Sequence, residues 1–121
     1  MAYICGRVAA QLALPTEQQF GLYLGALVHD IVKIAIPTQI INKSGRILPA
    51  ELSLLQTHAA RGAEVFEGID LPWPIVSMIR QHHERMDGSG YPDGLPGNEI
   101  CIEARVIAVA DTFDAMAGDR P

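Results

Sequence analysis

Residues 81–94 read Gln81-His82-His83-Glu84-Arg85-Met86-Asp87-Gly88-Ser89-Gly90-Tyr91-Pro92-Asp93-Gly94, and the rest of the chain is organised around them. Two adjacent histidines end an apolar segment, and a turn-rich loop with one tyrosine follows. Imidazoles beside carboxylates suit iron, manganese, cobalt, nickel or zinc. The glycines allow positive φ angles and close backbone approach, so the loop can fold back over a site. Taken alone, the two histidines are as consistent with an ordinary surface pair as with metal ligands. The positions of the other two histidines distinguish these two interpretations.

The composition bounds the class of protein. A chain of 121 residues is enough for one domain with a single core. Its net charge of −5 and its nine scattered Lys and Arg residues offer no basic patch for DNA or RNA. No apolar run approaches the roughly 20 residues of a membrane span, and the start lacks a signal-peptide pattern. The lone Cys5 and Cys101 are expected to be free thiols, with a chance disulfide as the alternative.

Helical periodicity predicts an all-α fold, a bundle of about five helices with the glycine-rich loop between the last two. The expected helices cover residues 2–14, 17–32, 50–66, 74–84 and 103–117, with a short helical turn at 37–41. Thr16 and Gln19 resemble a capping box for the second helix. The expected apolar faces are Ile4, Val8, Ala9 and Leu12, then Phe20, Leu24, Leu27 and Ile31, then Leu52, Leu55, Ala59 and Val65. The hydrophobic content of 49% suggests buried helices or an apolar surface that needs a partner.

Polar residues occur where these helices are otherwise apolar. His29, Asp30 and Lys33 crowd one side of a helix end. His58 lies close to an apolar face, and Asp111 lies among apolar residues of the last helix, where we expect its carboxylate to be buried. Each has an ordinary explanation: an Asp–Lys helix pair, a satisfied core histidine, a paired charge. Together, all four histidines and two inward aspartates favour a shared metal site, which only a folded bundle can assemble.

These residues also resemble a known family. His29-Asp30 with Lys33, then His58, His82-His83 and Asp111 follow the ligand order of the HD-domain metal phosphohydrolases. Residues 82–95 look like the signature of the HD-GYP subfamily, and residues 103–116 and 119–121 match it as well. The resemblance covers nearly the whole chain. A bare His-Asp pair is a weak signal, whereas the long stretch around Gly90-Tyr91-Pro92 is highly specific.

The resemblance implies a cytoplasmic bacterial phosphodiesterase that cleaves cyclic di-GMP to linear pGpG or GMP, commonly fused to an upstream receiver or sensor domain. It implies two divalent metals, usually iron or manganese, with nickel, cobalt and zinc as alternatives. Two metals lower the pKa of a shared water and clamp phosphoryl oxygens. Their implied ligands are His29, Asp30, His58, His82, His83 and Asp111, with Asp30 bridging. Lys33 and Asp30 would be catalytic, and the ligand would contact Gly90, Tyr91, Pro92 and Arg120.

The chain departs from the family pattern at three places. Ile4 stands where many members carry a histidine, so a third metal is not expected. Val32 and Ala35 stand where glycine is usual. Residues 1–121 are expected to form a single HD-GYP domain that lacks the usual C-terminal helices. Uncovered apolar surface then predicts a homo-oligomer.

Two other readings remain open at the level of sequence. The first is a non-catalytic signalling module that docks on diguanylate cyclase (GGDEF) domains through the GYP loop. The second is an HD hydrolase for another nucleotide, including a hybrid cyclic dinucleotide. The intact histidines and Asp111 favour the enzyme, whereas Ile4 and Val32 favour the module.

Overall fold

The computed structural model of the protein describes residues 1–29 and 45–117. Helices in these ranges are α1 (Ala2–Gln11), α2 (Thr16–Val28), α4 (Pro49–Gln56), α5 (His58–Phe66), α6 (Ile75–Gln81), the 3-10 turn η2 (Gly97–Glu99) and α7 (Ile102–Ala117). Strand-type pairing in the described ranges is limited to an isolated bridge between Asp87 and Pro96. The predicted all-α fold is confirmed. The predicted helical turn at 37–41 lies outside the described residues.

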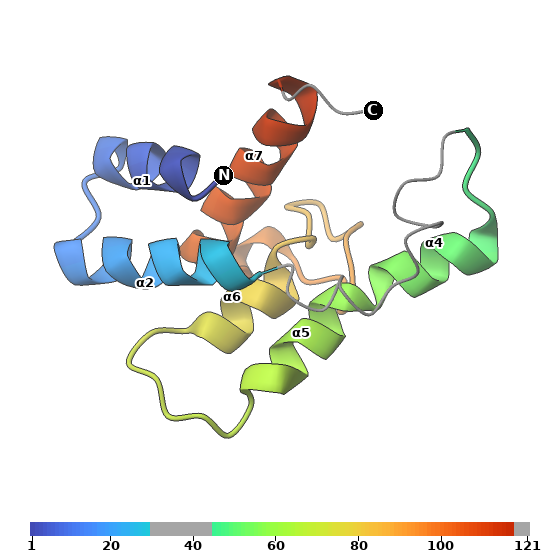
Figure 1. The fold of residues 1–121 in the computed structure, drawn as a ribbon, viewed down its shortest axis with the longest axis horizontal. Helices are drawn as coiled ribbons and strands as arrows, with labels where there is room; N and C mark the ends of the chain where they lie inside the picture. The colour runs from blue at the N-terminus through green and yellow to red at the C-terminus, as the bar shows by residue number, and fades with distance from the viewer. Residues whose placement is uncertain (30–44, 118–121) are drawn as a thin grey trace.

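Helix α6 lies at the centre of the fold. It packs against α2, α5 and α7, while α1 packs against α2 and α7. In Figure 1, α1 and α2 lie together on one side and α4 projects away on the other. The core joins five helices through Cys5, Ala9, Leu22, Ala26, Ala63, Ile75, Met78, Ile79, Val106, Ile107 and Ala110. The ends of α2 and α6 and the start of α5 therefore meet near the middle of α7, where the site forms.

The buried face of α2 differs from the predicted one. Phe20 and Leu27 were expected in the core, but they are 52% and 59% exposed. Leu22, Ala26 and the two glycines are buried instead. A Cβ at Gly21 would overlap the indole of Trp73, so the glycine lets the segment before α6 approach closely.

The face that is buried on α2 also sets the direction of His29. Leu22, Ala26 and His29 follow one another at steps of four and three residues, which places them on one side of a helix. All three are buried, and His29 is only 4% exposed. The small-residue face of α2 thus carries His29 into the interior. Ile31, the last residue of the predicted face, lies outside the described residues.

Helix α1 ends earlier than predicted, and Leu12 is 51% exposed rather than part of the core. Ala13 adopts a positive φ of 56°, and the amide of Leu14 donates to the carbonyl of Ala9 over 3.1 Å. This is the Schellman pattern of a helix C-terminus, with alanine in the position that glycine usually takes. The turn swings Leu12 outward, while Ala9 stays in the core.

The predicted helix 50–66 divides at Thr57 into α4 and α5. The hydroxyl of Thr57 donates to the carbonyl of Leu54 over 2.6 Å, which satisfies a carbonyl at the end of α4. Leu52 and Val65, two members of the predicted apolar face, are 48% and 55% exposed. The buried face of α5 is again made of small residues together with His58.

Two further local predictions were wrong. Helix α6 ends at Gln81 and not at Glu84, because the amide of Glu84 turns back to the carbonyl of Gln81 over 2.9 Å. The side chain of Gln19 donates to the carbonyl of Leu14 over 2.7 Å, and no side-chain cap forms at the start of α2, so the capping box is absent.

The sequence predictions about α7 and the thiols agree with the structure. Helix α7 forms almost as predicted. Cys5 and Cys101 are free, and burial raises the pKa of the Cys5 thiol to about 11. Burial also raises the pKa of Cys101, so neither thiol is activated. None of the described helices combines the length and apolar character needed to cross a membrane.

Candidate metal centre and nucleotide pocket

Three of the four histidines are held in the same way by the backbone. In each, Nδ1 lies 2.6 to 2.7 Å from the carbonyl oxygen of the residue three positions earlier. The pairs are His29 with Ala26, His58 with Leu55, and His82 with Ile79. A carbonyl can only accept, so Nδ1 carries the proton and Nε2 of the neutral ring keeps its lone pair. Such outer hydrogen bonds fix the tautomer and orientation of metal-binding imidazoles.

The Nε2 atoms converge. His58 Nε2 lies 3.3 Å from His82 Nε2 and 3.1 Å from His83 Nε2. One ligand atom from each of the three rings falls within 4.8 Å of the others. Lone pairs at this separation repel unless a positive charge, from a proton or a metal ion, lies between them. Three converging imidazoles therefore fit a transition metal by donor type, by spacing and by outer-shell support.

His29 and Asp111 extend this cluster on the α2 and α7 side. The ring of His29 meets that of His82 edge-on, with centroids 4.9 Å apart. His29 Nε2 lies 4.0 Å from Asp111 Oδ1. The Asp111 side chain is 27% exposed, so it is not buried as predicted. Of its expected apolar neighbours on α7, Val109 and Phe113 are exposed, and the carboxylate faces a pocket.

Tyr91 lies directly on one histidine of the cluster. Its ring stacks on that of His83, with centroids 5.0 Å apart and planes inclined by 16°. Its amide donates to the carbonyl of His83 over 3.3 Å. A Cβ at Gly90 would overlap the backbone of residues 83–85, so only glycine permits this approach. The loop folds back onto the histidines, as the glycine content predicted.

A polar pocket of about 380 Å³ opens beside the histidines. It is lined by Gln56, His82, His83, Glu84, Arg85, Ser89, Gly90, Tyr91, Ala108, Asp111 and Thr112. Five of these were predicted as site residues: His82, His83, Gly90, Tyr91 and Asp111. Pro92, also predicted, lines an adjoining groove that shares Gln56 and Tyr91 with the pocket. The cluster thus has a space beside it in which a ligand can meet both the imidazoles and the loop.

Residues 1–121 match the family described as HD domain. The chain belongs to the HD domain family. The resemblance to the HD-GYP type is confirmed by relatives named as cyclic di-GMP phosphodiesterases.

Several relatives of this HD domain share about two fifths of its residues. The cyclic di-GMP phosphodiesterase response regulator RpfG of Xanthomonas campestris pv. campestris is 42% identical over 100% of this chain and 32% of its own length. The 3'3'-cGAMP-specific phosphodiesterase 1 of Vibrio cholerae is 38% identical over 100% of this chain and 28% of its own length. A cyclic di-GMP phosphodiesterase of Pseudomonas aeruginosa is 39% identical over 94% of this chain and 28% of its own length. The chain spans about a third of the length of these relatives. Its HD domain is related to the HD domains of proteins named as cyclic dinucleotide phosphodiesterases.

Some predicted site residues of the HD domain cannot be placed. Asp30, Lys33 and Arg120 lie outside the described residues, as do Val32 and Ala35. Ile4, which stands where many members carry a histidine, is partly buried and packs against the core.

Sequence reasoning missed five polar residues that line the pocket of the HD domain, Glu84 among them. Arg85 and Ser89 lie within the signature stretch, and Thr112 follows Asp111. Their proximity in sequence to predicted site residues could have identified them. Gln56 gave no such signal, because it resembles any polar residue on a helix surface.

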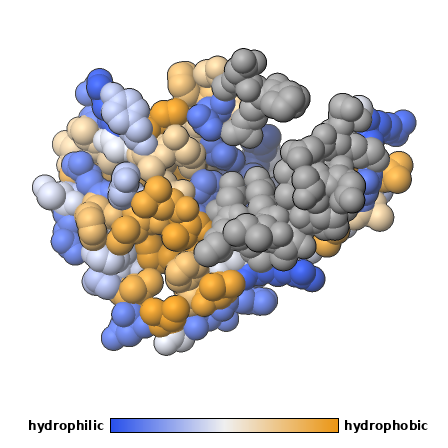
Figure 2. Space-filling model, in the orientation of Figure 1, coloured by the Kyte–Doolittle hydropathy of each residue, from blue (hydrophilic) through white to orange (hydrophobic). Residues whose placement is uncertain are grey.

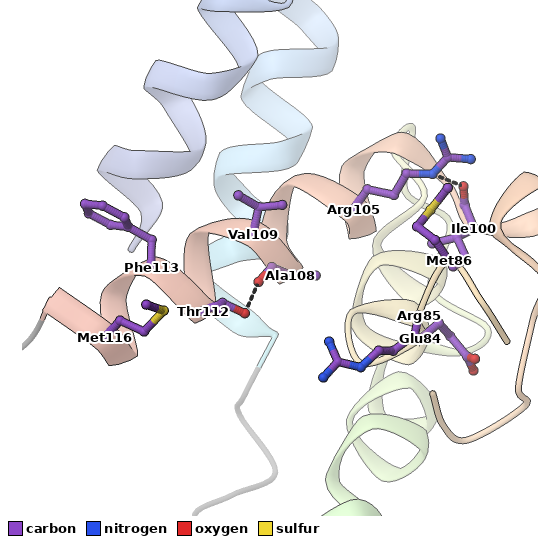
Figure 3. Close-up of a pocket in the computed structure, with 10 residues that line it drawn as sticks. All are labelled: Glu84, Arg85, Met86, Ile100, Arg105, Ala108, Val109, Thr112, Phe113 and Met116. Carbon is purple, nitrogen blue, oxygen red and sulfur yellow. Dashed lines mark hydrogen bonds between the residues drawn. The ribbon is translucent and has the colours of Figure 1, made fainter. Parts of the chain in front are cut away.

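A second hollow, of about 450 Å³ and largely apolar, adjoins the pocket of the HD domain. The two share Glu84, Arg85, Ala108 and Thr112. Figure 3 shows Val109, Phe113 and Met116 projecting from α7, with Met86 and Ile100 on the opposing loop. Arg105 lines the same hollow and donates to the carbonyls of Gly97 and Ile100 over 2.7 and 3.0 Å, which fixes the loop against α7.

Proposed function

We propose that this chain is a metal-dependent phosphodiesterase domain that hydrolyses a cyclic dinucleotide, with cyclic di-GMP as the first candidate and pGpG or GMP as the product. The convergence of the His58, His82 and His83 imidazoles beside a polar pocket carries the proposal. Concave sites with a few converging polar groups are where small ligands bind.

The proposed cofactors are two divalent transition metals, iron or manganese, with nickel, cobalt or zinc accepted by the same donor types. Their proposed ligands are His29, Asp30, His58, His82, His83 and Asp111. When bound, such metals supply Lewis-acid polarisation of a phosphoryl oxygen and acidify water. The carbonyl-bound tautomers of His29, His58 and His82 support this, because in each neutral ring the lone pair is then on Nε2, the atom type that binds a metal.

The other pocket residues suit a phosphodiester ligand. Arg85 lines the pocket, and the guanidinium group of an arginine favours phosphate oxygens. Ser89, Thr112 and Gln56 offer neutral hydrogen-bonding groups for sugar or base. Tyr91 presents a flat ring against which a ligand can pack. Lys33, Asp30 and Arg120 enter the proposal from the family resemblance, the first two as catalytic residues and the last as a phosphate contact.

A hybrid cyclic dinucleotide is the second candidate substrate. Relatives named for 3'3'-cGAMP are 34% to 38% identical, and those named for cyclic di-GMP include matches at 36% to 42%. These ranges overlap, so sequence identity does not distinguish cyclic di-GMP from 3'3'-cGAMP as the substrate. The relative named as a response regulator supports an upstream receiver domain in the full-length protein.

The test is metal content followed by hydrolysis. Protein purified without chelator, or loaded anaerobically with Fe(II) or Mn(II), should hold about two metals per chain by elemental analysis, and His82→Ala should hold fewer. The loaded protein should then hydrolyse cyclic di-GMP or 3'3'-cGAMP, resolved by chromatography of the products. Failure to bind any metal would contradict the proposal, and binding to diguanylate cyclase domains would then be examined as the non-catalytic alternative.

A further inference from the structure

Glu84 follows the two histidines but binds the loop. Its side chain is nearly buried, since the residue is 6% exposed. Oε2 accepts a hydrogen bond from the amide of Asp93, and Oε1 accepts one from the amide of Leu95, both over 2.8 Å. Figure 3 shows the carboxylate turned away from α7. Hydrogen bonds to an ionised acceptor are stronger than neutral ones, so this carboxylate is a firm anchor for residues 93–95.

The anchored amides come directly after Tyr91 and Pro92. On the other side of this dipeptide, the amide of Tyr91 donates to the carbonyl of His83. Consecutive residues, His83 and Glu84, therefore hold the loop before and after its tip. Between these two points the Tyr91 ring has its stacked position on the His83 imidazole.

The outer contact of the loop is of a different kind. Arg80 and Asp93 form a two-bonded ion pair, but their side chains are 36% and 38% exposed. Exposed pairs contribute little because water and salt screen them. Among the polar contacts that residues 93–95 make within the described part of the chain, those with Glu84 are the sheltered ones.

We propose that Glu84 is a positioning residue, which holds Tyr91 against His83 at the mouth of the metal and nucleotide pocket and is not itself a metal ligand. This rests on the proposed function for its effect on substrate. The signature glutamate would then act on the ligand only through the loop that carries Tyr91.

The main test is Glu84→Gln, which keeps the size of the side chain. A carboxamide has one acceptor oxygen, and its NH₂ group is a donor like the loop amides. One of the two amides therefore loses its acceptor. We expect hydrogen exchange at Asp93 or Leu95, resolved by NMR, to accelerate by about tenfold or more, as for one lost charge-assisted bond. The Tyr91 ring resonances should lose the shift caused by stacking on His83.

The same variant separates positioning from metal binding. Its metal content should equal that of wild type. KM for the cyclic dinucleotide should rise by about tenfold, with a smaller change in kcat, because the loop contacts the ligand and not the metals. Glu99→Gln is the matched control, since it removes the same charge from an exposed residue near the same loop. In Glu99→Gln, the rate of hydrogen exchange at Asp93 and Leu95 and the KM should equal those of wild type.

A second variant tests the hydrogen bond from the loop side. Replacing Leu95 by its α-hydroxy analogue turns the amide N–H into an ester oxygen and leaves all side chains unchanged. It should reproduce the faster exchange at Asp93, the loss of the Tyr91 shift and the rise in KM. This variant decides the matter if Glu84→Gln does not fold.

The outcomes are distinct. Unchanged loop exchange and Tyr91 resonances in folded Glu84→Gln would overturn the proposal, and so would loss of metal in that variant. If wild-type protein hydrolyses no cyclic dinucleotide, the proposed function fails, while exchange and ring shifts still decide whether Glu84 positions the loop.

Discussion

At the scale of single residues, Arg80 and Asp93 predict a measurable pH dependence. Arg80 Nε and Nη2 lie 2.8 and 2.9 Å from the two carboxylate oxygens of Asp93. The hydrogen bond from Arg80 lowers the pKa of the Asp93 carboxyl. A lowered folded-state pKa means that the pair stabilises the fold above the ordinary pKa of aspartate, and that this contribution disappears as pH falls through the lowered value.

Asp93→Asn should therefore lower the free energy of unfolding by about 0.5–1 kcal/mol at pH 7, a magnitude kept small because both partners are about a third exposed. The difference from wild type should shrink in acid and in 1 M salt. Urea unfolding at pH 7 and in acid measures it. Asp70→Asn, an exposed aspartate between α5 and α6, is the control. An equal loss at both pH values would show that the ion pair is not the cause.

The site residues differ in how far the sequence reveals them. The histidines and Asp111 were identifiable because titratable side chains in apolar segments need partners. Glu84 was recognised only as an acid beside two histidines, because the direction of its carboxylate depends on a loop that folds back from residues 93–95. The spacing of residues along a chain does not predict that a loop will fold back in this way. Gln56 lines the pocket because it is the last residue of α4, next to the start of α5.

At the scale of elements, the helices were largely predictable and their buried faces were not. Periodicity located α2, but it weighted Phe20 and Leu27 above the glycines that are buried. Large apolar residues dominate a hydrophobic pattern, whereas close helix packing selects small ones. The same bias placed Leu52 and Val65 on the buried face beside Ala59, whereas Ala59 is buried together with the small Ala63.

Two glycine substitutions test this account of packing. Gly21→Ala should destabilise the protein by about 1–3 kcal/mol, as overpacking does, because the new methyl group meets the Trp73 indole. Gly6→Ala is the matched control, since it lies in α1 with nothing within 4 Å of a Cβ. It should stabilise by about 0.5–1 kcal/mol through reduced backbone entropy of the unfolded chain. Thermal or urea unfolding measures both, and equal effects would refute close packing at Gly21.

At the scale of the whole molecule, one core joins helices from both ends of the described chain. Apolar side chains also remain on the surface. Figure 2 shows a hydrophobic area over α2 and the segment between α5 and α6, where Leu24, Leu27 and Leu71 line an apolar hollow. The apolar hollow beside α7 in Figure 3 is a second such area. Contiguous exposed apolar surface commonly marks an interaction site.

We expect this chain to self-associate through the α7 hollow, which lies beside the polar pocket and contains Phe113 and Met116 at 57% and 82% exposure. Phe113→Asp places a charge where a partner copy would exclude water, so it should shift the chain toward monomer. Light scattering coupled to size-exclusion chromatography measures the mass over a concentration series. Phe20→Asp is the matched control, because Phe20 is equally exposed, at 52%, but lies on α2. A monomeric wild type at high concentration would contradict self-association, and dissociation by Phe20→Asp alone would move the interface to α2.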